Sequence, residues 1–356
     1  MKKHNFYAGP AILPREVLKK AGEAINEFDG MGLSLIEISH RSKQFVAAMD
    51  RACALVKEMY SLSDEHEVIF LQGGASTQFY MTPFNLLNRN ESCAYLDTGS
   101  WASKAIKEAQ IFGNVHVVGS SKNQNYNYIP KGYDIPSDSK YFHFTSNNTI
   151  YGTQIHKFPK APGWLVADMS SDIFCKSIDA NQFDLIYAGA QKNLGPAGTT
   201  LVIVKKKILG NVDHQIPTMI DYRTHINKES MFNTPPVFAV YVCLLTLEWI
   251  IEQGGLSVIE QRNLNKSNKL YNEIDRNALF NGTAAIEDRS IMNVTFVSEK
   301  PELEAEFMSL AAEAGIVGIK GHRSVGGFRA SIYNAMPEEG VDCLIDIMKE
   351  FEKKFG

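Results

Sequence analysis

The chain has 356 residues, of which 44% are hydrophobic and 21% are charged, and its formal net charge is −4. This composition is typical of a globular protein longer than one hydrophobic core usually serves, so two domains are expected. The small negative charge excludes a global attraction to nucleic acid or to anionic membranes, and any basic anion-binding site must be local.

The cysteine pattern and the apolar stretches indicate in which cellular compartment the protein is expected. The five cysteines are dispersed and form no CxxC pair, which predicts reduced thiols in a cytoplasmic protein rather than a disulfide framework or a metal site. The first six residues precede no apolar run of the signal-peptide kind. The longest apolar stretch, 237–251, contains Glu248 and is too short to span a bilayer. We therefore expect no membrane and no nucleic acid among the partners.

Short apolar runs alternate with helical patterns from about residue 16 to residue 255. Helical patterns at 76–88 and 100–112 lie between runs that read as buried strands. The expected strands are 67–71, 93–96, 115–118, 141–144, 164–167, 185–187 and 200–204. This alternation predicts a large α/β domain over residues 16–256, with a mainly parallel seven-stranded sheet covered on both faces.

After residues 235–236 (PP) the pattern changes. The expected elements are helices at 238–253 and 256–276, a strand at 292–297, a helix at 301–314, a hairpin-like stretch at 316–333 and a closing helix at 338–355. This order predicts a small α+β domain over residues 257–356, to which we assign the N-terminal segment 1–15.

Lys192 has unusual surroundings for a lysine. It lies in the segment 187–198 (YAGAQKNLGPAG), and no other charged residue occurs between Ala188 and Val204. A lysine among small residues is expected to be partly buried, which eases loss of its proton and suits a Schiff-base lysine. The alternative is a turn lysine that extends its ammonium to solvent. The local sequence leaves both readings open.

Two strand-to-helix turns carry groups that suit a flat phosphorylated ligand. The segment 71–78 (LQGGASTQ) matches no dinucleotide or P-loop motif, but its glycines and Ser76 and Thr77 could hold a phosphate at a helix start. An unliganded turn is the alternative there. Trp101, at the next such turn, is either a core residue or a stacking face for a ring.

Thr149 and Asp168 also follow predicted strands. In α/β sheets the carboxyl ends of the strands line the ligand crevice. Asp168 could pair with a protonated ring nitrogen there, or could serve only as a helix cap. The order of glycine turn, tryptophan, threonine, aspartate and Lys192 fits pyridoxal phosphate, which needs a phosphate cup, a stacking face, an acid and a lysine.

The chain resembles the phosphoserine aminotransferases, which are class V members of the fold-type I pyridoxal-phosphate enzymes. The resemblance runs essentially from end to end. Its most specific segments are 6–14 (FYAGPAILP), 37–42 (EISHRS), 187–198 (YAGAQKNLGPAG), 230–236 (SMFNTPP) and 321–337 (GHRSVGGFRASIYNAMP).

The resemblance implies that pyridoxal 5′-phosphate is the cofactor, carried by Lys192 and held at its ring nitrogen by Asp168. It places Trp101 on the ring and Thr149 near the phenolic oxygen. The residues that it implies for the cofactor phosphate are Ala75, Ser76 and Gln191 of the same subunit, and Asn233 and Thr234 of the other. A homodimer with shared sites is therefore implied.

Arg329 is the residue that we expect to bind the substrate carboxylate. It opens the predicted strand 329–333, and arginine is the side chain best suited to a bidentate contact with a carboxylate or phosphate. Without the resemblance, a surface arginine is the simpler interpretation. The resemblance assigns the substrate phosphate or distal carboxylate to His322, Arg323 and Arg41 from the neighbouring subunit, and it brings Ala8 close to the substrate.

The implied reaction is ping-pong transamination between L-glutamate and 3-phosphonooxypyruvate, which yields O-phospho-L-serine and 2-oxoglutarate. A related step of pyridoxine biosynthesis, which yields 4-phosphonooxy-L-threonine, is also open. Two positions depart from the family: Ala8 often corresponds to Ser or Gly, and Ser76 corresponds to Arg in some bacterial members. Another class V enzyme, such as an alanine–glyoxylate transaminase or a cysteine desulfurase, and a catalytically silent phosphate-binding dimer are the alternatives.

Overall fold

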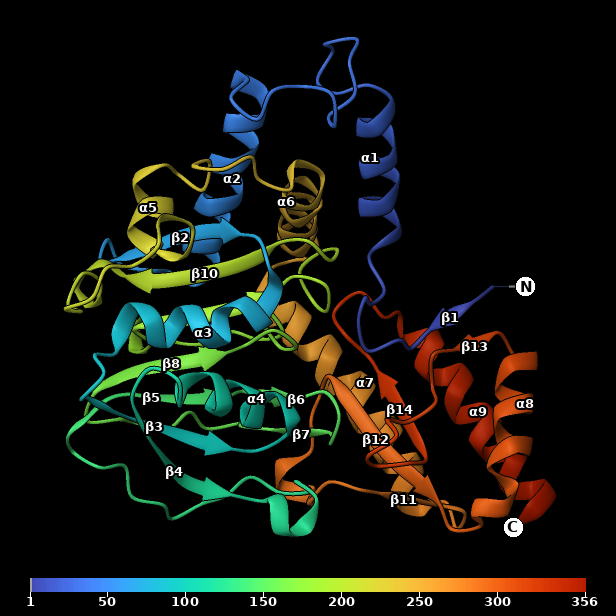
Figure 1. Ribbon diagram of the computed structural model, residues 1–356. Helices are drawn as coiled ribbons and strands as arrows, with labels where there is room; N and C mark the ends of the chain where they lie inside the picture. The colour runs from blue at the N-terminus through green and yellow to red at the C-terminus, as the bar shows by residue number, and fades with distance from the viewer. Residues whose placement is uncertain (1) are drawn as a thin grey trace.

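A seven-stranded sheet forms the centre of the computed structural model, which describes residues 2–356 (Figure 1). Its strand order is β2-β10-β9-β8-β5-β3-β4, and β10 alone runs antiparallel to its neighbours. The strands are β2 (His66–Leu71), β3 (Ser92–Asp97), β4 (Asn114–Ser120), β5 (Ser139–Thr145), β8 (Trp164–Asp168), β9 (Leu185–Gly189) and β10 (Thr200–Lys205). All seven predicted strands occur, and the predicted α/β fold class is confirmed.

Helices cover both faces of this sheet, and most residues of its central strands are therefore buried. Helices α3 (Gly74–Leu86) and α4 (Ser100–Ala109) pack on one face around Phe79 and Tyr187. Helices α1 (Arg15–Asn26), α2 (Lys43–Met59) and α6 (Val237–Glu252) contribute to the core of the other face. The sheet is thus the middle layer of three.

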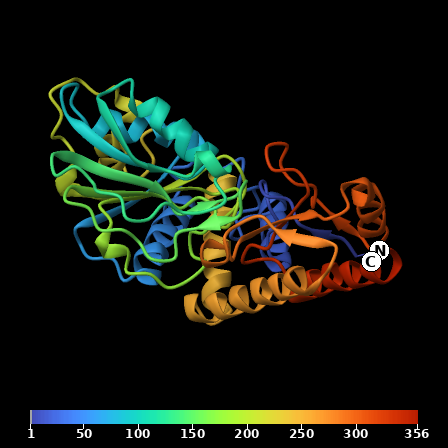
Figure 2. The same cartoon turned by 90° about the horizontal axis from the view of Figure 1, so that it is seen from below.

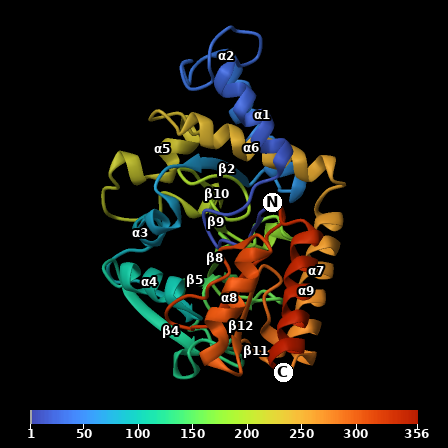
Figure 3. The same ribbon diagram turned by 90° about the vertical axis from the view of Figure 1, so that its right-hand side faces the viewer.

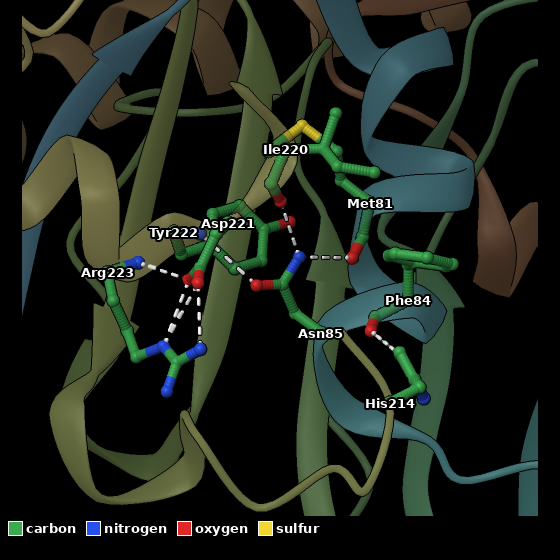
Figure 4. Close-up of polar contacts among 8 residues, drawn as sticks. All are labelled: Met81, Phe84, Asn85, His214, Ile220, Asp221, Tyr222 and Arg223. Atoms are coloured by element: carbon green, nitrogen blue, oxygen red, sulfur yellow. Dashed lines mark hydrogen bonds and ion pairs between the residues drawn. The ribbon is translucent and has the colours of Figure 1, made fainter. Parts of the chain in front are cut away.

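The segment after β10 is attached to the C-terminal half of α3 (Figure 4). Asn85 donates a hydrogen bond to the carbonyl of Ile220 at 2.7 Å and accepts one from the backbone N–H of Tyr222 at 3.1 Å. Asp221 caps the short helix α5 (Tyr222–Asn227) through the N–H of Arg223. These contacts hold in place the chain that leads to residues 230–236.

A second, three-stranded antiparallel sheet consists of β11 (Phe280–Gly282), β12 (Asn293–Ser298) and β14 (Phe328–Ser331). Helices α7 (Leu256–Arg276), α8 (Glu304–Glu313) and α9 (Glu338–Phe355) enclose its own phenylalanine-rich core (Figure 3). Near the N-terminus, β1 (His4–Asn5) pairs in parallel with β13 (Ile316–Val317), and Phe6 joins this core. The separate core favours the predicted small domain, although the boundary near residue 256 stays a prediction.

Two details of the C-terminal part differ from the sequence-based prediction. The stretch 316–333 is not a regular hairpin: β13 pairs with β1, and only an isolated bridge joins Lys320 to Phe328. The predicted helix at 301–314 begins with a 3-10 turn at Pro301–Leu303 before α8. Partners that are remote in sequence explain the first difference, since strand pairing follows packing rather than proximity in the chain.

Helices α6 and α7 meet at an angle of 87° across residues 253–255. Among residues 2–356, no single helix is long and apolar enough to cross a membrane, although this bent pair has the required length and composition when taken together. A small two-stranded ladder of β6 (Asn147–Asn148) and β7 (Thr153–Gln154) brackets the turn that contains Thr149.

Candidate active site

Lys192 lies at the exit of β9, at the edge of the sheet that faces the smaller sheet. Its ammonium donates a hydrogen bond to Oγ1 of Thr149 at 3.0 Å and lies 5.5 Å from the centroid of the Trp101 ring. Gly9 approaches it from the N-terminal segment, where an added Cβ would lie 3.3 Å from the Lys192 side chain. The predicted lysine, threonine and tryptophan are therefore brought together.

The protein surroundings change the acidity of Lys192. Desolvation lowers the pKa of its ammonium from 10.5 to about 8; Arg329 adds to this shift and Asp168 opposes it. Although part of the residue's surface is exposed, the ammonium is enclosed by protein atoms. An amine with such a pKa is available as a nucleophile and as a proton carrier near neutral pH.

Asp168 ends β8 and is buried, with 4% of its surface exposed. Its Oδ1 accepts hydrogen bonds from the N–H and the hydroxyl of Ser170, at 3.0 and 2.6 Å. Burial raises the pKa of the carboxyl group, while Ser170 and the charge of Lys192 act in the opposite direction. Because one oxygen is fixed by Ser170, the other is left to pair with a cationic ligand atom.

Trp101 lies in the first turn of α4 and presents its ring to the ammonium of Lys192. The ammonium of Lys104 lies 4.4 Å from the same ring centroid. The indole Nε1 of Trp101 is buried without a hydrogen-bond partner among the described residues. A buried indole donor usually has a partner, so this orphan atom indicates that the ring borders a ligand site.

The glycine turn before α3 has the geometry that a phosphate cup requires. Gly73 and Gly74 have φ angles of 94° and 66°, and α3 begins at Gly74, so the N–H groups of Ala75 and Ser76 belong to its first turn. A Cβ added to Gly189 would lie 3.4 Å from the Ala75 nitrogen and 2.8 Å from Oε1 of Gln191. Ala75 and Gln191, two of the predicted phosphate residues of this subunit, thus meet beside Gly189.

Arg329 connects the smaller sheet to the lysine site. It lies on β14, and its Nη1 donates to the carbonyl of Thr149 at 3.1 Å. Its Nε is buried without a partner among residues 2–356, and no carboxylate there forms an ion pair with it. Burial lowers the pKa of the guanidinium. An unpaired, desolvated guanidinium beside Lys192 is suited to bind a carboxylate.

His322 and Arg323 lie on the loop that precedes β14. Nδ1 of His322 is 2.7 Å from Oγ of Ser324, and burial together with the charges of Arg329, Arg323 and Lys104 lowers its pKa. These residues therefore form a positive region next to Arg329. Ala8 lies on the other side of the site, with its carbonyl accepting a hydrogen bond from the hydroxyl of Tyr333 at 2.6 Å.

Three other predicted residues do not join Lys192 within one chain. Arg41 borders a hollow beside residues 227–232. Asn233 lines a cavity of about 300 Å³ together with Gly73 and Thr77, on the outer side of the glycine turn. The carbonyl of Thr234 accepts a hydrogen bond from Gln72 at 2.6 Å.

Sequence reasoning missed several residues that support the site. Ser170, which fixes Asp168, follows it by two positions, a spacing typical of a local aspartate turn that could have signalled it. Asp172 accepts hydrogen bonds from Ser146 and Gln154, and burial raises its pKa to about 6. Tyr333 and its partner Asn293 come from remote segments and carry no local signal.

These residues fit pyridoxal phosphate. The glycine turn offers free N–H groups for the phosphate, Trp101 offers a ring face, Asp168 offers an unused oxygen and Lys192 offers an amine of lowered pKa. The orphan indole of Trp101 and the orphan Nε of Arg329 are further positions that a cofactor and its substrate would satisfy. Among residues 2–356, no group of three His, Cys, Asp or Glu side chains is arranged to hold a metal ion.

Comparisons with known proteins show the family of the chain. The family model of the class-V aminotransferases matches residues 3–344. A phosphoserine aminotransferase from Parabacteroides distasonis is 62% identical over 356 residues, which cover 99% of this chain and 100% of the relative.

Solved structures agree as well. The phosphoserine aminotransferase from Bacillus circulans subsp. alkalophilus matches with a TM-score of 0.97 and 43% identity, covering 100% of this chain and 99% of the other. The PLP-bound phosphoserine aminotransferase from Trichomonas vaginalis matches with a TM-score of 0.93 and 35% identity, covering 98% and 100%.

Fold, site and comparisons together define a class-V aminotransferase of fold type I. Within that class, the chain belongs to the phosphoserine aminotransferase family.

Proposed function

We propose that this chain transfers the amino group of L-glutamate to 3-phosphonooxypyruvate by ping-pong transamination, giving 2-oxoglutarate and O-phospho-L-serine. The observation that carries the proposal is the position of Thr149 between two groups. Its hydroxyl accepts a hydrogen bond from Lys192, and its carbonyl accepts one from Arg329. The amine that exchanges with the substrate and the cation that holds the substrate carboxylate are thus set side by side.

Each residue has a role in this reaction. Pyridoxal phosphate supplies a carbonyl carbon for the amino group and a ring that accepts electrons when the substrate Cα loses its proton. Lys192 holds the cofactor and then, as a free amine, moves the proton at Cα. Asp168 would keep the ring nitrogen protonated, Trp101 would offer its ring face to the cofactor, and Thr149 would interact with the phenolic oxygen.

The phosphate of the cofactor is assigned to the start of α3. We place Ala75, Ser76 and Gln191 of the same subunit around it, since Ala75 and Gln191 meet beside Gly189 and Ser76 follows Ala75 in the first turn of α3. Ser76 contributes a hydroxyl and no charge, so the substrate phosphate depends on His322, Arg323 and Arg41. Ala8 offers only its backbone to the substrate, and its carbonyl is already bound to Tyr333.

We further propose a homodimer with shared sites, in which Asn233 and Thr234 contact the phosphate of the partner's cofactor and Arg41, His322 and Arg323 serve the partner's substrate. The position of Arg41 and Asn233 away from Lys192 in the single chain supports this arrangement. A cytoplasmic location is proposed from the cysteines, all five of which are free thiols.

A coupled assay tests the substrates. With glutamate and 3-phosphonooxypyruvate we expect turnover, and with alanine and glyoxylate none, because only the first pair carries a second anion for the basic residues. The phosphorylated 2-oxo acid that yields 4-phosphonooxy-L-threonine is a third arm, since it carries the same two anions. Turnover with the alanine and glyoxylate pair alone contradicts the proposal, and a Lys192→Ala variant gives the background rate.

A further inference from the structure

Lys266 is a buried lysine that the proposed chemistry does not use. It lies on α7, the long helix that runs beside α9 in Figure 2, and only 1% of its surface is exposed. Its ammonium donates hydrogen bonds to the carbonyls of Ile332, Tyr333 and Met336, at 3.0, 2.8 and 3.1 Å. All three donors of the ammonium are thus used by one backbone segment, residues 332–336.

Burial of the Lys266 ammonium without a carboxylate partner has a free-energy cost of desolvation. Burial lowers the pKa of Lys266 to about 7; Glu338 opposes the shift and Arg262 adds to it. No carboxylate of the described residues forms a salt bridge with the ammonium. A desolvated cation held only by carbonyl groups is a poor device for stability alone, because an apolar side chain of similar size avoids the desolvation cost.

The segment that Lys266 holds begins directly after the strand that contains Arg329. Strand β14 ends at Ser331, and the hydrogen bond from the N–H of Ile332 to the carbonyl of Met292, at 2.8 Å, continues its attachment to the smaller sheet. A shift of the 332–336 segment therefore moves β14, and with it the guanidinium of Arg329.

Residues 332–336 also contact the loop after β9, which contains Lys192. The N–H of Asn334 donates to Oδ1 of Asn193, the residue after Lys192, at 3.0 Å. The side chain of Asn334 donates to the carbonyl of Phe174 at 2.9 Å and accepts from Nδ2 of Asn263 at 2.8 Å. Asn263 lies one turn before Lys266 on α7. Residues 332–336 are thus fixed from α7 on one side and from the Lys192 loop on the other.

We propose that Lys266 is a positioning residue for transamination: by fixing residues 332–336 through their carbonyls, it sets where Arg329 lies relative to Lys192. The inference rests on the proposed role of Arg329 in binding the substrate carboxylate. Lys266 touches neither cofactor nor substrate; it acts through β14 and through the contact between Asn334 and Asn193. Misplacement of a substrate-holding group by about 1 Å is enough to change rates by orders of magnitude.

The test compares Lys266→Met with Lys269→Met in the cofactor-loaded enzyme. Lys269 lies one turn later on the same helix, is exposed, and pairs with Glu338 and Asp342. For Lys266→Met we expect the KM for glutamate to rise about tenfold or more, with the cofactor content unchanged. For Lys269→Met we expect no change. An unchanged KM in Lys266→Met overturns the proposal.

A double-mutant cycle separates positioning from a general structural effect. If Lys266 acts through Arg329, the Lys266→Met change raises the KM for glutamate in the native background but not in an Arg329→Ala background. An equal rise in both backgrounds overturns the proposal. Absence of glutamate turnover in every arm, the native enzyme included, would instead count against the proposed function itself.

Hydrogen–deuterium exchange supplies a readout that is independent of activity. In the cofactor-free protein, the amides of residues 332–336, including the Asn334 N–H, are expected to exchange faster in Lys266→Met than in Lys269→Met. Unchanged protection of these amides overturns the proposal. If Lys266→Met does not fold, Lys266→Gln, which keeps two donors, is used, with an intermediate rise in KM expected and no rise contradicting the proposal.

Discussion

The acidity of Lys192 depends on the balance of the groups around it. Desolvation and the Arg329 charge lower its pKa, whereas the Asp168 and Asp172 carboxylates raise it. Burial and one cation thus oppose two carboxylates, and the net result is a pKa of about 8 for Lys192. Such an amine is partly deprotonated near neutral pH, as covalent binding of an aldehyde cofactor requires.

The first prediction concerns the pH dependence of cofactor capture. Only the neutral amine attacks, so the rate at which cofactor-free protein binds pyridoxal phosphate covalently should rise with pH, with a midpoint of about 8. Between pH 7 and pH 9 the neutral fraction, and hence the rate, increases about tenfold. Stopped-flow absorbance measures this rate.

The matched variant is Asp168→Asn. Because the Asp168 carboxylate raises the pKa of Lys192, its neutralisation should move the midpoint of the rate to lower pH. A midpoint near the ordinary lysine value of 10.5 in the native protein would show that the ammonium is solvated and that its burial has no chemical consequence.

At the scale of elements, the start of α3 depends on the glycine turn. Gly73 has a φ of 94°, and a Cβ there would lie 1.9 Å from Oγ1 of Thr77, whose hydroxyl bonds back to the Gly73 carbonyl at 2.9 Å. Any side chain at this position therefore meets both backbone strain and a clash. The first turn of α3 would have to shift, together with the N–H groups assigned to the cofactor phosphate.

The second prediction follows from this geometry. A Gly73→Ala variant should bind pyridoxal phosphate about tenfold more weakly, because its helix start is displaced. Gly132→Ala is the control: Gly132 has a φ of 69° with open space around it, so it carries similar strain without a clash and far from the site. Equal cofactor affinity of the two variants, measured by equilibrium titration, would show that the turn does not form the phosphate site.

The elements also show where sequence patterns succeed. The strands of the large sheet were predictable because they are continuous apolar runs between glycine and polar turns, and burial on both faces needs no further information. The stretch 316–333 was not, since β13 pairs with β1 from the other end of the chain. No local pattern specifies a partner more than 300 residues away.

At the scale of the whole molecule, the proposed dimer is the main prediction. If the sites are shared, a heterodimer of Lys192→Ala and Arg41→Ala subunits contains one site with both changes and one with neither. We expect it to recover about half of the native activity, although each homodimer is inactive or nearly so. Differently tagged subunits, co-expressed and purified as the mixed dimer, allow the measurement.

A second heterodimer serves as the control. Lys192 and Asp168 lie in the site of the same subunit, where the Asp168 carboxylate raises the pKa of Lys192. A Lys192→Ala and Asp168→Ala heterodimer therefore has a defect in each site and should stay inactive. A first heterodimer as inactive as this control would mean that Arg41 serves the site of its own chain, and a fully active Arg41→Ala homodimer would mean that Arg41 serves neither site.

The sequence by itself determined the α/β order of elements, the position of the proposed cofactor lysine and the order along the chain of the groups proposed to surround the cofactor. These features are local: each residue follows its own strand, and the parallel sheet brings equivalent strand ends to one edge. The choice of pyridoxal phosphate followed from that order.

Only the tertiary structure decided what holds Arg329 beside Lys192. The contacts of Arg329 with Thr149, of Asn334 with Asn193 and of Lys266 with residues 332–336 join segments that are 66 to 180 residues apart. Such contacts depend on how two separate cores pack, and neither composition nor periodicity encodes that packing directly. A buried lysine without a carboxylate partner therefore became recognisable only once its carbonyl partners were known.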